Sequence, residues 1–171
     1  MINTKNLLED NNIEFILDYG TLLGAYRDNK FIPYDTDIDV SVYKSDYQKL
    51  YNLLDKEILK KYNLLKAKGP FRGDNLNSLK LINFNGKLMT ENILRSKGEI
   101  YIDIYKINFR PKTDKYKFYN TIFNIPTNTE KYLEHMYGEN WKTPIKNKHA
   151  NWPYSAVSIK NTQWFKNNSI K

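Results

Sequence analysis

Residues 19–42, YGTLLGAYRDNKFIPYDTDIDVSV, place three aspartates, Asp35, Asp37 and Asp39, at every second position. The alternation of polar and apolar residues over 37–43 predicts a strand. Side chains at i and i+2 of a strand lie on the same face, with Cα atoms about 6.6 Å apart, so Asp37 and Asp39 should project side by side. Carboxylates this close repel each other, and burial increases the repulsion, so something must neutralise them.

A divalent cation is the simplest neutralising partner, because Mg²⁺ and Mn²⁺ prefer carboxylate oxygens. Ile38, Val40 and Val42 alternate with the acids and predict the opposite face of the strand to be core. We therefore expect one face of the strand to pack in the core and the opposite face to carry the charged site.

Asp103 is a third candidate ligand, since it lies between Ile102 and Ile104 in a second apolar strand. An aspartate in such a strand is costly unless it is paired. Next to the first strand it would complete a three-carboxylate cluster that holds one or two metal ions, and two ions about 4 Å apart can clamp both oxygens of a phosphoryl displacement. The alternative for Asp103 is a buried pair with a lysine or arginine.

Two other interpretations of the three aspartates remain open. DTDIDV resembles the start of a calcium-binding EF-hand loop, although Val40 stands where that loop needs glycine. The acids could also be charges on a solvated edge strand. For Asp35 we expect a turn residue or an indirect ligand rather than direct metal contact.

Gly20 and Thr21 begin a short predicted helix over residues 20–26. Free N–H groups at a helix N-terminus, next to a hydroxyl, favour phosphate binding, and glycine allows close approach of the backbone. Arg27 could clamp a phosphate oxygen from the same helix. Asp18 is expected to be a local helix cap.

The bulk composition fits one globular domain of 171 residues with a net charge of +8. This charge suits anionic partners, although a chain rich in Lys, Asn, Ile and Tyr also acquires it from AT-rich coding. The absence of cysteine excludes disulfides and zinc–thiolate sites. No apolar run has the length of a signal peptide or a membrane span, so we expect a cytoplasmic protein without a transmembrane segment.

The remaining pattern predicts alternating helices and strands and therefore an α/β or α+β domain. We expect a single domain with a small mixed central sheet flanked by helices, over residues 1–145, and a basic C-terminal extension over 146–171. Ser45 should cap a long helix, and residues 79–84 and 87–90 should form a hairpin. The expected helices are 4–12 (capped by Asn3), 20–26, 45–62 and 128–138 (ended by Gly138), and the other expected strands are 13–17, 37–43, 99–107 and 115–120.

The ordered motifs resemble the LicD/fukutin family of the nucleotidyltransferase (DNA polymerase β-like) superfamily. GTLLGAYR at 20–27, FIPYDTDID at 31–39 and YIDIY at 101–105 are similar to that family's motifs, with Tyr34 in place of the usual tryptophan and Tyr105-Lys106 in place of Phe-Pro. SLKLIN at 78–83 and YLEHMYGENWKTP at 132–144 also resemble family segments. The resemblance covers about residues 12 to 145 and implies the nucleotidyltransferase fold.

This resemblance also implies a metal-dependent phosphotransferase that moves phosphocholine or a polyol phosphate from a CDP-linked donor to a glycan hydroxyl and releases CMP. In this interpretation Asp37, Asp39 and Asp103 are the catalytic and metal-binding residues, with Mg²⁺ or Mn²⁺ as cofactor. The donor-binding residues would be Gly20, Thr21, Arg27 and Lys80. The alternatives are a nucleotidyltransferase that transfers NMP to a small molecule or RNA, and a non-catalytic basic module that binds RNA or another acidic polymer.

Overall fold

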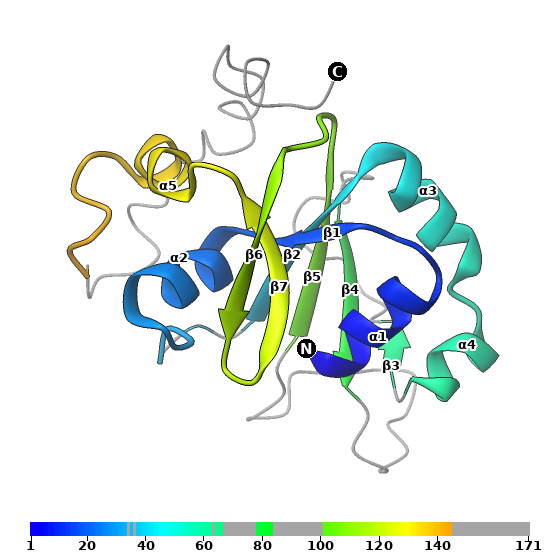
Figure 1. Cartoon of the computed structure of the whole chain (residues 1–171). Helices are drawn as coiled ribbons and strands as arrows, with labels where there is room; N and C mark the ends of the chain where they lie inside the picture. Colours follow the sequence, from blue (N-terminus) through cyan, green and yellow to red (C-terminus); the bar gives the residue numbers. More distant parts are fainter. Residues whose placement is uncertain (34, 36, 63, 67–77, 84–100, 145–171) are drawn as a thin grey trace.

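The computed structural model describes residues 1–33, 35, 37–62, 64–66, 78–83 and 101–144. Two sheets form its centre (Figure 1). The larger sheet has the strand order β1-β2-β5-β4-β3, and β6 and β7 form a separate two-stranded sheet. The strands are β1 (Phe15–Leu17), β2 (Asp37–Tyr43), β3 (Leu64–Lys66), β4 (Ser78–Asn83), β5 (Tyr101–Ile107), β6 (Thr113–Phe118) and β7 (Thr121–Pro126).

Five helices surround these strands within the described residues: α1 (Ile2–Asp10), α2 (Tyr19–Asp28), α3 (Lys44–Leu53), α4 (Lys56–Lys61) and α5 (Thr129–Tyr137). In Figure 1, α2 and α5 lie to the left of the large sheet, α3 and α4 lie to its right, and α1 is drawn over its β3–β4 side. None of the helices in this part of the chain is both long and apolar enough to cross a bilayer.

The large sheet is mixed, as the sequence predicts. β2 pairs in parallel with β5, while β1·β2, β4·β5 and β3·β4 are antiparallel. β2 therefore has a neighbour on each side, which excludes the solvated edge strand. It is also a regular strand from Asp37 to Tyr43, which excludes the EF-hand loop.

The core forms where the apolar faces of β2 and β5 meet the helices. Ile38, Val40 and Val42 are at most 7% exposed, as expected for an inward face, and Ile102 and Ile104 are at most 1% exposed on the neighbouring strand. Burying each such side chain stabilises the fold by about 1.5–3 kcal/mol. These residues anchor the two strands that carry the acids.

The prediction of one long helix over 45–62 is wrong, because the structure forms two helices in this range, α3 and α4. The Asp55 carboxylate accepts a hydrogen bond from the Ile58 backbone N–H and so starts a new helix, which interrupts the first one. Ser45 is not a cap either, since it lies inside the first turn of α3 and its hydroxyl donates to Asp46.

Other element boundaries differ by smaller amounts. The first helix begins at Ile2 without a side-chain cap from Asn3, and β3 and β7 were not expected. The strand predicted at 115–120 is confirmed as β6, with its bounds shifted by two residues, and the chain turns at Tyr119 and Asn120 into β7. The second arm of the predicted hairpin, 87–90, lies outside the described residues, as does 145–171, so the predicted division into 1–145 and 146–171 stays a prediction. Gly138 ends α5 with a φ of 88°, as expected.

Candidate active site

The turn between β1 and α2 holds Asp39 in place. The Gly20 backbone N–H donates to Asp39 Oδ2 at 3.1 Å, and the Asp39 backbone N–H donates to Thr21 Oγ1 at 2.8 Å. A Cβ at position 20 would lie 2.4 Å from Asp35 Oδ2, so only glycine allows this approach. Gly20 and Thr21 thus position a carboxylate, and their role as a phosphate cradle stays a prediction.

Three carboxylates converge at the beginning of β2. Asp35, Asp37 and Asp39 each offer an oxygen, and these oxygens all lie within 4.8 Å of one another. The sequence predicts Asp37, Asp39 and Asp103 as the three ligands and Asp35 only as a turn residue or an indirect ligand. In the structure an oxygen of Asp35 lies among the clustered oxygens. The signal was present in the sequence, because Asp35 has the same two-residue spacing as the other two. An all-oxygen, acidic donor set of this size fits Mg²⁺ or Mn²⁺.

Asp103 lies on the neighbouring strand, where it is the register partner of Asp39. Both residues are 4% exposed. The three-carboxylate cluster that the sequence predicts requires Asp103 on the same face as Asp39, and directly paired residues on adjacent strands do share a face. Asp103 is therefore beside the cluster, although its function as a ligand or base stays a prediction.

Burial raises the pKa of the Asp39 carboxyl well above its usual range. The negative charges of Asp37, Asp35, Asp103 and Asp18 raise this pKa further. Both effects disfavour the ionised form. A bound cation would favour the ionised form and so lower the pKa of Asp39 again, which is consistent with a metal site.

Tyr105 is a polar neighbour of Asp103 that the sequence did not single out as functional. Its hydroxyl donates to Asp103 Oδ2 at 3.3 Å, and its ring packs against Tyr19 with centroids 4.6 Å apart. Burial, followed by the charges of Asp39 and Asp103, raises the pKa of the Tyr105 hydroxyl. The hydroxyl therefore stays protonated and remains a hydrogen-bond donor.

Asp18 is more than the local cap that the sequence predicts. Its carboxylate accepts from the Tyr19 backbone N–H at 2.9 Å, as a cap should. It also accepts from the Ser41 hydroxyl on β2 and, at 2.6 Å, from the Tyr132 hydroxyl on α5. These partners lie far apart in the sequence, so no local pattern could have indicated them.

The two predicted phosphate-binding cations differ in how the structure places them. Arg27 lies in the last turn of α2, where its Nη2 and Nε contact the two Asp28 carboxylate oxygens at 2.7 and 3.1 Å. It is therefore paired two turns away from Gly20. Lys80 is the register partner of Asp103 on β4, so its backbone lies beside the site. Donor binding by either residue stays a prediction.

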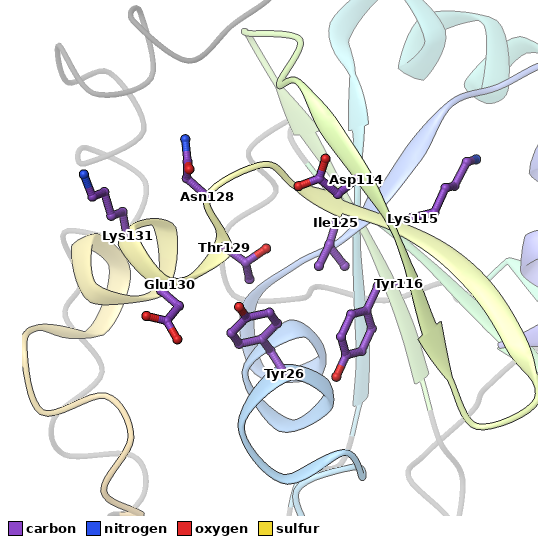
Figure 2. Close-up of a pocket in the computed structure, with 9 residues that line it drawn as sticks. All are labelled: Tyr26, Asp114, Lys115, Tyr116, Ile125, Asn128, Thr129, Glu130 and Lys131. Atoms are coloured by element: carbon purple, nitrogen blue, oxygen red, sulfur yellow. The ribbon is translucent and has the colours of Figure 1, made fainter.

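A cavity of about 490 Å³ lies between the other end of α2, the β6–β7 sheet and the beginning of α5 (Figure 2). The rings of Tyr26 and Tyr116 line it, with centroids 5.8 Å apart. None of the clustered carboxylates contributes to the lining, so cavity and cluster are separate features. The polar lining residues are Asp114, Lys115, Asn128, Thr129, Glu130 and Lys131.

Comparison with known proteins agrees with the predicted family. The family model described as LicD/FKTN/FKRP, nucleotidyltransferase domain, matches residues 12–158. The lipopolysaccharide cholinephosphotransferase LicD of Haemophilus influenzae is 39% identical over 61 residues, which cover 36% of this chain and 23% of that protein. An uncharacterised protein of Rickettsia prowazekii is 31% identical over 90 residues, covering 42% of this chain and 34% of that protein.

The chain thus matches about a third or less of the length of these relatives. Among solved structures, a lincomycin-bound lincosamide antibiotic adenylyltransferase, LnuA, superposes with a TM-score of 0.48 at 12% identity over 94% of either chain. The family model itself covers the β1–α2 turn, the carboxylate cluster, Asp103 and α5. The chain therefore belongs to the LicD/FKTN/FKRP family and carries a nucleotidyltransferase domain of that family.

Proposed function

We propose that the protein is a metal-dependent phosphotransferase that moves a substituted phosphate, phosphocholine or a polyol phosphate, from a CDP-linked donor to a glycan hydroxyl. The observation that carries this proposal is the carboxylate cluster, whose oxygens lie within 4.8 Å of one another in a chain of the LicD family. The Haemophilus relative, a lipopolysaccharide cholinephosphotransferase, supports the reaction class.

Asp35, Asp37 and Asp39 would hold Mg²⁺ or Mn²⁺, which neutralises charge on the donor diphosphate. Asp103 would accept the proton of the acceptor hydroxyl. The acceptor oxygen then forms a bond to the transferred phosphorus, the bond between that phosphorus and the CMP oxygen breaks, and CMP leaves. Tyr105 would hold Asp103 through the hydrogen bond to Oδ2. Such catalysis depends mainly on positioning and electrostatics.

The donor phosphates would contact the Gly20–Thr21 turn, with Lys80 and Arg27 as candidate cations. The contacts of Arg27 with the Asp28 carboxylate use Nε and Nη2 and partly neutralise the charge of Arg27, so this residue is the weaker candidate. The observation that favours Lys80 is its pairing with Asp103 in the sheet.

The cavity at the other end of α2 is our proposed location for the acceptor. Tyrosine rings combined with carboxylate, amide and hydroxyl groups suit a sugar, which offers an apolar ring face and many hydroxyls. Tyr26 follows Gly20 by six residues of helix, or about 9 Å, a span that an extended glycan can bridge.

Calorimetric binding in the presence of Mg²⁺ tests this function. CDP-choline, CDP-ribitol and CDP-glycerol should be compared with CTP and CMP, followed by detection of CMP release with a glycan acceptor. We expect one CDP conjugate to bind more tightly than CTP.

A nucleotidyltransferase that transfers NMP is the second candidate, favoured by the description of the matching domain. CTP binding as tight as that of the best conjugate, with CMP incorporated into an acceptor, would establish this candidate instead. A basic RNA-binding module would bind polymer and show neither activity. The clustered carboxylates disfavour that function, because they would repel an RNA phosphate unless a cation were bound.

A further inference from the structure

Asp18 joins three separate parts of the fold. It is fully buried, and its carboxylate accepts hydrogen bonds from Tyr19 at the beginning of α2, Ser41 on β2 and Tyr132 on α5. Buried carboxylates are stable only when donors surround them. Tyr132 is 1% exposed and supplies the one donor among these three that comes from α5.

The backbone of Asp18 connects this junction to the candidate active site. Its N–H donates to the Asp39 carbonyl at 3.2 Å. The next residue, Tyr19, has a φ of 44°, a left-handed conformation that non-glycine residues adopt only when their surroundings enforce it. This sharp turn aims the Gly20 N–H and the Thr21 hydroxyl at Asp39.

We infer that Tyr132, acting through Asp18, is a positioning residue that fixes the Gly20–Thr21 turn and thereby the Asp39 carboxylate. The inference assigns a role to the 132–144 segment, which the proposed reaction does not otherwise use. Its relevance to catalysis rests on the proposed function.

Contacts from the same segment support the assignment. Trp141 packs on Tyr26 with ring centroids 6.2 Å apart, so α5 and the residues after it hold α2 near both of its ends. Burial, followed by the charge of Asp18, raises the pKa of the Tyr132 hydroxyl, which therefore remains a donor.

The test uses Tyr132→Phe, which removes only the hydroxyl. The matched control is Tyr62→Phe, because the Tyr62 hydroxyl also donates to a carboxylate, Asp10 Oδ2 at 2.8 Å, but joins α4 to α1. Amide hydrogen exchange of the metal-free proteins, measured by NMR, gives a readout that needs no activity.

We expect the Gly20 and Asp39 amides of Tyr132→Phe to exchange at least about tenfold faster relative to the β6 and β7 amides, and to be unaffected in Tyr62→Phe. Exchange of those two amides in step with the β6 and β7 amides would overturn the inference, because Tyr132 would then be a structural core residue only. Ser41→Ala removes another donor to Asp18 and should reproduce the local effect if Tyr132→Phe does not fold.

Mn²⁺ titration of the same proteins separates this inference from the proposed function. We expect Tyr132→Phe to raise the Mn²⁺ dissociation constant about tenfold, as loss of a ligand-supporting hydrogen bond typically does, while Tyr62→Phe leaves it unchanged. Wild-type protein that binds no Mn²⁺ would refute the metal-dependent function, and the amide exchange would still decide the role of Tyr132.

Discussion

Asp39 on β2 and Asp103 on β5 are direct partners in the parallel pairing at the centre of the sheet, and each is 4% exposed. Neighbouring strands are about 4.8 Å apart, so two buried carboxylates face one another across one strand spacing. With Asp35 and Asp37 beside them, the carboxylates repel one another, and protons or cations that reduce this negative charge should stabilise the fold.

Asp39→Asn should separate metal binding from folding. The amide keeps an oxygen that can accept from Gly20 but removes the charge, so the metal-free variant should be as stable as wild type or more stable at neutral pH. Mg²⁺ or Mn²⁺ at 100 times its dissociation constant should stabilise wild type by about 2.7 kcal/mol, or roughly 5–10 °C in Tm, and the variant by much less. Thermal denaturation with and without metal measures both effects. The exposed Asp114→Asn should respond to metal as wild type does, and an equal response of Asp39→Asn would argue against ligation.

The pKa of Asp39 predicts how metal-free stability depends on pH. Because folding raises this pKa above its unfolded value of about 3.9, the folded protein binds the proton more tightly than the unfolded chain. The stabilisation of the folded protein that comes from protonated Asp39 is fully present below pH 4 and is lost as pH rises through the folded pKa. The free energy of unfolding of wild type, relative to Asp39→Asn, should therefore fall as pH rises from about 4, as measured by urea denaturation without metal. A difference that stays constant with pH would contradict the assignment.

Gly20→Ala should damage the site while leaving the fold intact. The new Cβ would lie 2.4 Å from Asp35 Oδ2, so that carboxylate must shift away from position 20 and change its place relative to Asp37 and Asp39. We expect at least about tenfold weaker Mn²⁺ binding and little change in metal-free Tm. Gly24→Ala is the informative comparison, because its Cβ would meet the Lys30 backbone carbonyl oxygen at 2.7 Å. That variant should lose stability by about 1–3 kcal/mol, while its folded fraction still binds Mn²⁺. Unchanged Mn²⁺ affinity in Gly20→Ala would remove Asp35 from the proposed ligands.

Asp114→Asn tests the proposed acceptor cavity. Asp114 is exposed, lines the cavity and is not part of the carboxylate cluster. If a glycan binds there, KM for the acceptor should rise by up to roughly 10- to 100-fold, since one hydrogen bond to a charged group contributes about 1.5–3 kcal/mol, while kcat and donor affinity stay unchanged. Steady-state kinetics with varied acceptor measure the split. Glu139→Gln, an exposed change outside the cavity, is the control, and a KM equal to that of wild type in both variants would locate the acceptor elsewhere.

Local patterns predicted much of the architecture. The alternation over 37–43 predicts β2 with its observed bounds, because the two-residue period of a strand is written directly in the sequence. The Gly20 start of a helix, the Gly138 end of another and the alternating strand around Asp103 are also local signals. The interruption of the 45–62 helix was missed, since the Asp55 cap competes with a helical pattern that continues on both sides of it.

The sequence by itself determined which residue types are present at the candidate site. Three aspartates at two-residue spacing, a Gly-Thr turn and an aspartate in an apolar strand follow from local order, and the LicD resemblance built on them is confirmed. Only the tertiary structure decided how these groups meet. It made Asp103 the register partner of Asp39 on one side and of Lys80 on the other, brought Asp35 into the cluster and joined Asp18 to Tyr132 across 114 residues of chain. The reason is physical: strand pairing and the packing of α5 bring together side chains that are far apart in the chain, and no local periodicity encodes those contacts.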